Sequence, residues 1–411
     1  MKPLKYLFIS SMLFVATSCG NSWLDLEPST SVDTETSIKI LSDVEFTLNG
    51  IYSTMQSSDA YSGRLVYYGD VTGDDMQAVS STKRVANYYR FNFTKDDNPS
   101  SHWSYLYSII QNCNLILMNI DKLVIDEDDK AYRDDLKGEA LAIRGLALFD
   151  LTRIFGYPYL KDDGASLGVP IIEGLSTIDS KPTRNTVAQC YTKIIDDLTQ
   201  SLSLLGEKFN KGKINKWGAM VLLSRVYLYK GENANALKMA SDAIIGAEKN
   251  KYALWTNEDY PTAWGEDASA SKPGEVLFEI VNLTTDSPGK ESMGYLNSYD
   301  GYDDMCITCS FYQFLKEDPK DIRLKLLSFD KKYYAYVNKY QPQREENIED
   351  ANIPLIRLSE AYLNAAEAAV KENDNDAAVK YLDPIVKRAN PDNTVVGQTI
   401  TCLLYTSDAA D

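Results

Sequence analysis

Hydrophobic and small residues recur with helical spacing along residues 353–388. The first half of this stretch places four residues at i, i+4, i+7 and i+11, on one face of an α-helix: Leu358, Tyr362, Ala365 and Ala369. A polar run at 371–375 interrupts the pattern, and a second helical stripe follows it. Two short amphipathic helices joined by a tight turn form a hairpin that must stack on other helices to bury both faces.

Similar hairpin patterns occur earlier in the chain. Residues 217–245 contain a helix of small residues, a polar turn at 230–233 and a second helix that contains alanine. A third candidate runs through residues 137–155, with a later helix at 187–205. The copies are typical of tetratricopeptide hairpins but lie far apart instead of in tandem. We therefore predict a mostly α fold over residues 37–400, with tetratricopeptide-like hairpins as a scaffold and long irregular, partly β insertions.

The insertions are expected at about residues 56–100 and 252–345, where helical periodicity is weak. Both segments are rich in aromatic residues and contain many Gly, Asn and Asp residues. Residues 275–280 follow Pro273-Gly274 and are β-branched or aromatic at several positions, which predicts a strand. Irregular segments on a rigid scaffold often carry binding residues, so we expect the function to lie here.

The first residues predict an export signal. Lys2 and Lys5 precede a short apolar run that is too short to span a bilayer, so residues 1–18 are interpreted as a cleaved signal peptide. Cleavage before Cys19 resembles processing at a bacterial lipobox, although Ala16 stands where leucine is usual. Cys19 is therefore the predicted lipidation site, followed by a polar tether at 19–36. The alternative is an ordinary secretory signal that ends near a cysteine.

Composition excludes some partners and favours others. The chain has 411 residues, a formal charge of −17 and ordinary globular hydrophobicity, so repulsion by phosphates argues against a nucleic-acid partner. The 28 tyrosines and five tryptophans are more informative, because exposed aromatic rings are common in binding surfaces.

Catalytic and metal-binding patterns are sparse. His102 is the one histidine in the sequence and lacks a triad partner. Asp70, Asp74 and Asp75 do not have the spacing of a calcium loop, so no metal or cofactor is predicted. Cys306 and Cys309 form an isolated CxxC pair, which we interpret as thiols in preference to a local disulfide or a redox pair. Glycoside hydrolysis needs two placed carboxylates, and no motif singles out such a pair.

Sugar recognition fits the insertions. Sugar rings present flat C–H faces that dock on aromatic rings and hydroxyl rims that bind polar side chains. The candidate ring platforms are Tyr88, Tyr89, Trp255, Trp264, Tyr295, Tyr299 and Tyr302, with Asn87, Asn297 and Asp300 as polar partners. Any one of these residues could instead be packed between loop and scaffold.

The chain resembles the SusD/RagB family of Bacteroidota outer-membrane lipoproteins. The blocks that carry the resemblance follow the family's order from Ser18-Cys19 and Trp23-Leu24-Asp25 through EALAIRGLALFDLTRIFGYPYL to WGAMVLLSRVYLY, DPKDIRL and IPLIRLSEAYLNAAEAA. The resemblance implies a surface-exposed, lipid-anchored glycan-binding protein that works with a SusC-like TonB-dependent transporter. It implies four tetratricopeptide-like hairpins and no fixed sugar-site motif, so no site residue is carried over.

The C-terminal end departs from this pattern. After about residue 400 the family continues into further helices, whereas residues 401–411 are similar to translated adapter sequence. We therefore expect a non-native tail and a truncated scaffold.

Two other functions remain open. A tetratricopeptide scaffold could bind peptide or protein segments, in which case a concave groove lined by Asn, Lys and Arg is expected. An enzyme would require a carboxylate pair about 5 to 9 Å apart in a cleft.

Overall fold

The structure is a computed structural model that describes residues 37–94, 100–177, 179–265, 273–330, 334–342 and 347–401. The predicted signal peptide, the tether with Cys19 and residues 402–411 of the predicted tail lie outside the described residues. The helices are α2 (Leu41–Met55), α3 (Arg64–Thr72), α4 (Ala86–Tyr89), α5 (Ser100–Asn119), α6 (Lys130–Phe155), α7 (Val187–Leu204), α8 (Lys216–Lys230), α9 (Asn233–Lys249), α10 (Met293–Leu296), α11 (Cys309–Leu315), α12 (Leu358–Lys371) and α13 (Asn375–Ala389). The strands are β1 (Met76–Ala78), β2 (Val276–Ile280), β3 (Met305–Ile307), β4 (Leu327–Phe329), β5 (Ala335–Val337) and β6 (Ile353–Arg357).

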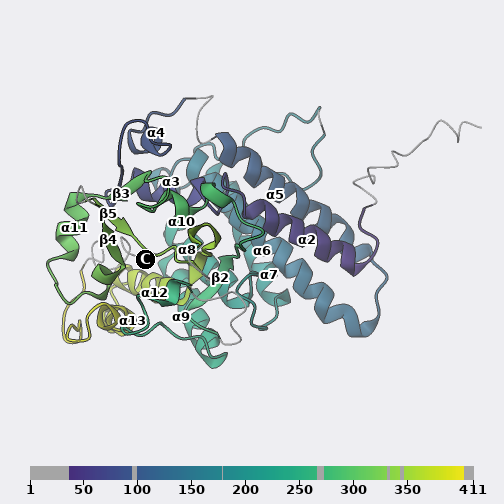
Figure 1. The fold of residues 1–411 in the computed structure, drawn as a ribbon. Helices are drawn as coiled ribbons and strands as arrows, with labels where there is room; N and C mark the ends of the chain where they lie inside the picture. Colours follow the sequence, from purple (N-terminus) through teal and green to yellow (C-terminus); the bar gives the residue numbers. More distant parts are fainter. Residues whose placement is uncertain are drawn as a thin grey trace, which may run out of the picture.

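The predicted mostly α-helical fold is confirmed, and its scaffold is a stack of helical hairpins (Figure 1). The pairs α6–α7, α8–α9 and α12–α13 pack within themselves and then on one another. Local sequence ends the helices where the turns require it. Gly231 adopts a left-handed conformation with φ of 81° after α8, and the Asp374 side chain accepts a hydrogen bond from Ala377 N–H at the start of α13.

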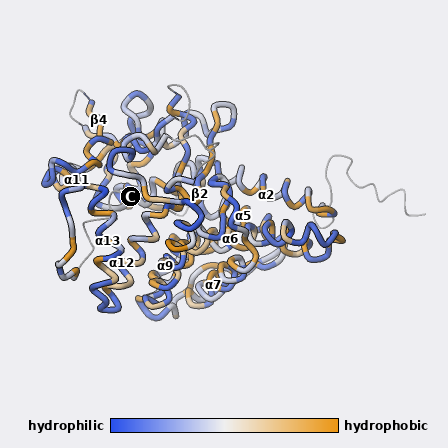
Figure 2. Tube along the Cα trace, turned by 90° about the horizontal axis from the view of Figure 1, so that it is seen from below, coloured by the Kyte–Doolittle hydropathy of each residue, from blue (hydrophilic) through white to orange (hydrophobic). Residues whose placement is uncertain are grey.

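Hairpins that are distant in sequence are neighbours in space. Helix α9 packs directly on α12, although the whole second insertion lies between them in the chain. Within the α8–α9 hairpin, a Cβ added at Gly246 would lie 2.0 Å from a ring carbon of Trp217, so only glycine permits this approach. Figure 2 shows hydrophobic and hydrophilic positions alternating along helices such as α2 and α5, as expected for helices with one buried face.

Helices α5, α6 and α7 are joined by a buried arginine. Arg144 on α6 donates to both carboxylate oxygens of Asp197 at 2.8 and 2.6 Å, and to the Asn114 side-chain oxygen at 2.8 Å. Nearby, Tyr52 on α2 donates to Glu139 at 2.7 Å. Burial raises the pKa of Glu139 to about 7.

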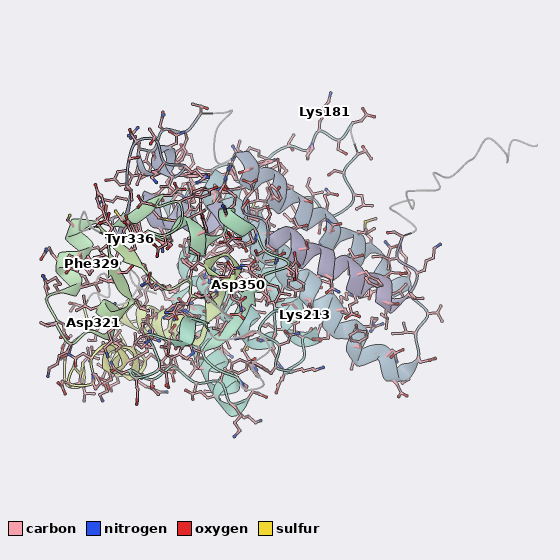
Figure 3. All side chains as sticks on the ribbon, in the orientation of Figure 1. Lys181, Lys213, Asp321, Phe329, Tyr336 and Asp350 are labelled. Atoms are coloured by element: carbon pink, nitrogen blue, oxygen red, sulfur yellow. The ribbon has the colours of Figure 1, made fainter. Side chains whose placement is uncertain are left out.

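The strands form three small antiparallel ribbons, one of which connects the two insertions. Strand β1 from the first insertion pairs with β3 from the second, β2 pairs with β6, and β4 pairs with β5. Phe329 and Tyr336 lie on the adjacent strands of the β4–β5 ribbon (Figure 3). The strand predicted at 275–280 is confirmed as β2. Residues 353–357, which the sequence pattern placed at the start of a helical hairpin, form β6 instead, because their backbone pairs with β2.

Glu275 joins the second insertion to the last helix. Its carboxylate is fully buried and accepts hydrogen bonds from Arg357 Nη1 at 2.9 Å and from Arg388 Nη1 at 3.0 Å. The backbone N–H of Trp255 donates to Glu275 Oε2 at 2.8 Å. We call this arrangement, formed by Glu275, Arg357, Arg388 and Trp255, the Glu275 junction.

The cysteines carry free thiols in the described part of the chain. Cys113 and Cys190 are buried, Cys306 is buried and Cys309 is exposed. The interpretation of Cys306 and Cys309 as thiols is therefore confirmed. Among the residues with a described placement, no helix is long and apolar enough to cross a membrane.

Candidate functional site

Three of the predicted aromatic residues lie together on one loop, at residues 292–304. The backbone N–H of Tyr302 donates to the Tyr295 carbonyl at 3.0 Å, and the two rings meet edge to face with centroids 5.0 Å apart. Gly301 permits this fold, because a Cβ there would lie 2.0 Å from the Tyr295 carbonyl oxygen. Tyr299 is 45% exposed, and its ring lies 6.2 Å from that of Tyr336.

Arg84 from the first insertion reaches this loop. Its guanidinium lies 3.9 Å from the centroid of the Tyr302 ring, within the range of a cation–π interaction. It also pairs with Asp304 at 3.0 Å and Glu291 at 3.2 Å, while Lys83 donates to the Tyr302 carbonyl. We call Arg84, Tyr295, Tyr299 and Tyr302 the aromatic surface.

Arg84 was not among the sequence candidates. It stands 220 positions before Asp304 in the chain, and no local pattern marks it as a neighbour of the loop. Asp300, which was predicted as a polar partner, is exposed on the same loop beside Tyr299. The aromatic surface therefore combines predicted rings with an arginine that sequence reasoning missed, and the predicted carboxylate of Asp300 lies beside it.

The candidates on α4 have different surroundings. Tyr88 is fully buried, and its ring meets those of Tyr67 and Tyr68 edge to face at 5.5 and 5.6 Å. It offers no exposed face for a ligand, because these neighbours cover it. Tyr89 is 39% exposed, and Asn87 is half-buried.

The two tryptophan candidates lie inside the insertion. Trp255 and Trp264 are both 6% exposed, with ring centroids 5.0 Å apart, and Tyr260 completes the cluster. The Arg357 guanidinium lies 4.7 Å from the centre of the Trp264 ring. Because Arg357 also belongs to the Glu275 junction, this cluster packs the insertion onto the scaffold and is not an exposed platform.

Asn297 lines a cavity of about 160 Å³ that opens to solvent, which we call the loop cavity. It is 4% exposed, and its Nδ2 donates to the Val337 carbonyl at 2.8 Å. Asp70 reaches both the cavity and solvent. Partial removal of water raises the pKa of Asp70 to about 6, and nearby Lys339 opposes this shift.

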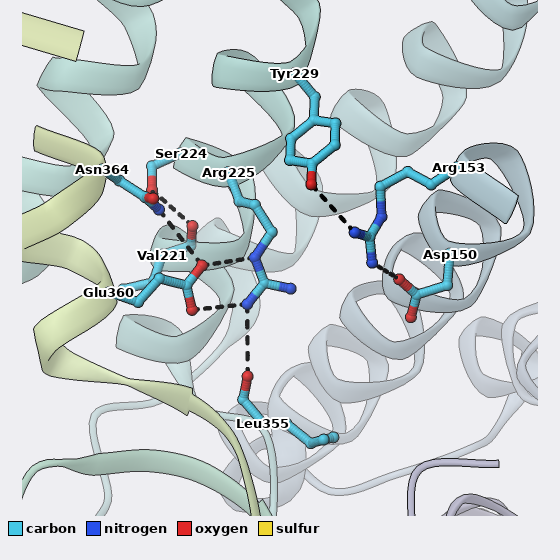
Figure 4. A network of polar contacts seen from close by, with 9 residues as sticks. All are labelled: Asp150, Arg153, Val221, Ser224, Arg225, Tyr229, Leu355, Glu360 and Asn364. Carbon is cyan, nitrogen blue, oxygen red and sulfur yellow. Dashed lines mark hydrogen bonds and ion pairs between the residues drawn. The ribbon is translucent and has the colours of Figure 1, made fainter. Parts of the chain in front are cut away.

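A second hollow region lies in the scaffold between α6, α8 and α12, where Figure 4 shows a polar network. Arg225 binds both carboxylate oxygens of Glu360 at 2.6 and 2.7 Å. Arg153 pairs with Asp150 and donates to the Tyr229 hydroxyl at 3.4 Å. Two hollows of about 490 and 430 Å³ share Arg153, Arg225 and Tyr229, and we call them the scaffold groove. Each guanidinium faces a carboxylate, so these charges are largely balanced inside the protein.

The surroundings of His102 and the arrangement of the described acidic side chains do not indicate a catalytic histidine or a metal-binding site. His102 is 1% exposed, and one ring nitrogen lies 3.2 Å from the Asp59 carbonyl oxygen. Burial lowers the pKa of His102, which keeps the ring neutral at physiological pH. Within the described ranges, no group of three or more His, Cys, Asp or Glu side chains is arranged to hold a metal ion.

Comparison with known proteins identifies the family. A SusD-like family described as starch-binding and associating with the outer membrane matches residues 22–228, and the SusD family matches residues 326–408. The chain is 81% identical to a putative sugar-binding protein of Bacteroides vulgatus, with a TM-score of 0.88 over 89% of this chain and 82% of that one. A SusD superfamily protein of the same species is 38% identical, with a TM-score of 0.81 over 87% and 82% of the two chains.

More distant relatives are also described as SusD-like proteins. A SusD-like protein of Formosa agariphila is 28% identical over 73% of this chain and 57% of its own length. Two further SusD-like relatives are covered over 48% and 39%, so the chain spans about half the length of these curated relatives. The order of sequence blocks, the stacked hairpins and these matches lead to one conclusion: the chain belongs to the SusD/RagB family.

Proposed function

We propose that this protein is a non-enzymatic, cell-surface glycan-binding lipoprotein that captures oligosaccharides and delivers them to a SusC-like TonB-dependent transporter. The observation that carries the proposal is the aromatic surface, where rings from one insertion are fixed by a cation from the other. Two comparisons support the ligand class: the family description names starch binding, and the relative at 81% identity is described as a putative sugar-binding protein.

The aromatic surface suits a sugar chain chemically. Tyr299 presents an exposed ring on which the C–H face of a sugar can stack, and Asp300 beside it can accept hydrogen bonds from hydroxyl groups. Tyr302 is held by Arg84, so part of the surface is ordered before the ligand arrives. A preformed surface loses less conformational entropy on binding than a flexible one.

Membrane attachment is proposed to occur through Cys19. A processed lipoprotein carries several acyl chains, which together anchor a protein stably. Replacing Cys19 with Ala should move the protein from the membrane fraction to the soluble fraction of cells. Retention in the membrane would refute lipidation, while the glycan-binding proposal would be unaffected.

Calorimetry against a panel of polysaccharides and oligosaccharides tests the binding proposal. The variant Tyr299→Ala should weaken binding of the best ligand about tenfold, which corresponds to about 1.4 kcal/mol. Tyr157→Ala is the matched control, because Tyr157 is 57% exposed but lies outside both insertions. Absence of binding across the panel, or equal effects of the two variants, would refute this assignment.

The scaffold groove supports a second candidate function, the binding of a peptide segment. Its arginines and Asn364 match the lining expected for a peptide groove, although the arginines already pair with Asp150 and Glu360. Replacing Arg225 would then reduce the binding of a partner protein and leave glycan binding unchanged. The opposite pattern favours the aromatic surface.

A further inference from the structure

The loop cavity lies between the two insertions and the scaffold strand β6. Met293 and Asn297 come from the second insertion around α10, Met76 comes from β1 of the first insertion, and Pro354 comes from β6. Its walls are of two kinds. Methionine, isoleucine and leucine side chains form one part, whereas carboxylate, amide, indole and basic groups form the other.

Two buried polar atoms at this cavity have no hydrogen-bond partner among the described residues. One is Asn297 Oδ1, which is the free end of an amide whose nitrogen is fixed to the Val337 carbonyl. The other is Nε1 of Trp264, whose side chain also lines the cavity. Buried polar groups are normally hydrogen-bonded, and leaving one unpaired destabilises the folded protein. An acceptor and a donor that both lack partners can be matched by the hydroxyl groups of a ligand, since each hydroxyl can donate and accept.

Charge limits the class of ligand further. Arg357 is paired with Glu275 at 2.9 Å, and Arg323 is paired with Asp321 at 2.7 Å. Asp70 and Asp75 also line the cavity, where Lys339 acts on both carboxylates. When Lys339 and Arg388, the second arginine on Glu275, are included, the charges around the cavity balance and match a ligand without net charge, whose hydroxyl groups could donate to Asp70 and Asp75.

The volume of the loop cavity limits the ligand to one ring. A protein cavity of about 150 Å³ accommodates benzene, so a volume of about 160 Å³ has room for one six-membered ring and not for an internal stretch of polysaccharide. Apolar walls suit the C–H faces of such a ring, and the polar groups suit its hydroxyls. Asp70 remains in contact with solvent, which marks an open end of the cavity.

We propose that the loop cavity binds a single neutral sugar unit, either a free monosaccharide or the terminal residue of a chain, separately from the aromatic surface. This inference takes its ligand class from the proposed function. The two sites share the loop at residues 292–304. On this loop the Tyr299 side chain is exposed, whereas the Asn297 side chain is buried. A chain end held in the cavity would therefore lie close to rings that can stack on the following sugars.

Ligand-observed NMR with a panel of neutral monosaccharides, together with thermal-shift measurements, tests the proposal on the full chain. Val337→Phe adds bulk to the cavity wall, while the backbone carbonyl that holds Asn297 is retained. Val337→Ala is the matched control, because it changes the same position and leaves the cavity open. Asn297→Ala removes the unpaired acceptor. Melting curves of all three variants establish that they fold.

The expected result is binding of at least one monosaccharide to the wild type, to Val337→Ala and to Tyr299→Ala. Binding should disappear in Val337→Phe and weaken up to about tenfold in Asn297→Ala, as expected for the loss of one hydrogen bond. Failure of every monosaccharide to bind, or equal binding by folded Val337→Phe and the wild type, would overturn the cavity site. Loss of oligosaccharide binding in Tyr299→Ala with intact monosaccharide binding would support both sites. Intact oligosaccharide binding in Tyr299→Ala would refute the aromatic surface alone.

Discussion

Replacing Glu275 with Gln removes one negative charge from the Glu275 junction and almost preserves the shape of the side chain. The carboxylate is 0% exposed, and the Arg357 and Arg388 side chains that it binds are 7% and 6% exposed. In the variant, two buried guanidinium groups face a neutral amide. One end of that amide is a hydrogen-bond donor, which cannot accept from either arginine or from the Trp255 N–H.

The size of the expected destabilisation follows from the burial of the charges in the Glu275 junction. Removing one partner of a buried ion pair costs about 3–5 kcal/mol, because the remaining charge stays in a poorly solvated position. Glu275 binds two arginines, whereas glutamine retains one oxygen acceptor. We therefore expect Glu275→Gln to lower the free energy of unfolding by about 3–5 kcal/mol. The loss should fall on the second insertion, because the junction attaches that segment to α13.

Urea unfolding followed by tryptophan fluorescence measures this effect. Asp392→Asn is the control, because it breaks an ion pair with Lys320 in which the two side chains are 68% and 71% exposed. Such surface pairs contribute about 1 kcal/mol or less. The reasoning is refuted if Glu275→Gln shifts the unfolding midpoint no more than Asp392→Asn does.

Two further predictions concern the scaffold. Glu139 has a folded-state pKa of about 7 against a usual value of 4.5, so its buried ionisation makes the folded state less stable as pH rises between these values. Glu139→Gln should therefore raise stability by up to about 3 kcal/mol at pH 8 and by little at pH 4.5; an equal effect at both pH values in thermal melts would contradict this. Gly246→Ala should cost about 1–3 kcal/mol, because its Cβ would overlap Trp217. Gly50→Ala in α2, which has open space around it, should stabilise by about 0.5–1 kcal/mol, and equal melting temperatures of the two glycine variants would refute the packing argument.

The scaffold was largely predictable because its signals are local. The helical spacing that begins at Leu358 and the turn at Gly231 are visible within a few residues of sequence. The structure contains α12 at the first position, and α8 followed by the turn at the second. The strand β6 was not predicted, since its apolar residues could equally have extended a helix. Its pairing partner β2 lies more than 70 residues earlier and decides the outcome.

The candidate site was predicted only in part, for a similar reason. Tyr299 and Trp264 stand in similar segments rich in Gly, Asn and Asp, yet one ring is exposed and the other is 6% exposed. The difference depends on distant residues such as Arg357, which lies over the Trp264 ring. Arg84 had no sequence signal at all, because its neighbours Tyr302 and Asp304 are distant in the chain.

The contact of α9 with α12 bears on how such proteins can diversify. Since these helices touch, the second insertion leaves and re-enters the hairpin stack at neighbouring points, and the stack does not depend on the insertion's length. Doubling the length of such a loop costs only about 0.6 kcal/mol of closure entropy. The β1–β3 ribbon and the Arg84–Tyr302 contact join the two insertions, and they therefore constrain how an insertion can be exchanged between proteins. A graft that carries residues 252–345 from one protein to another must also carry residues 56–100, because the two segments pair through a ribbon and a cation–π contact.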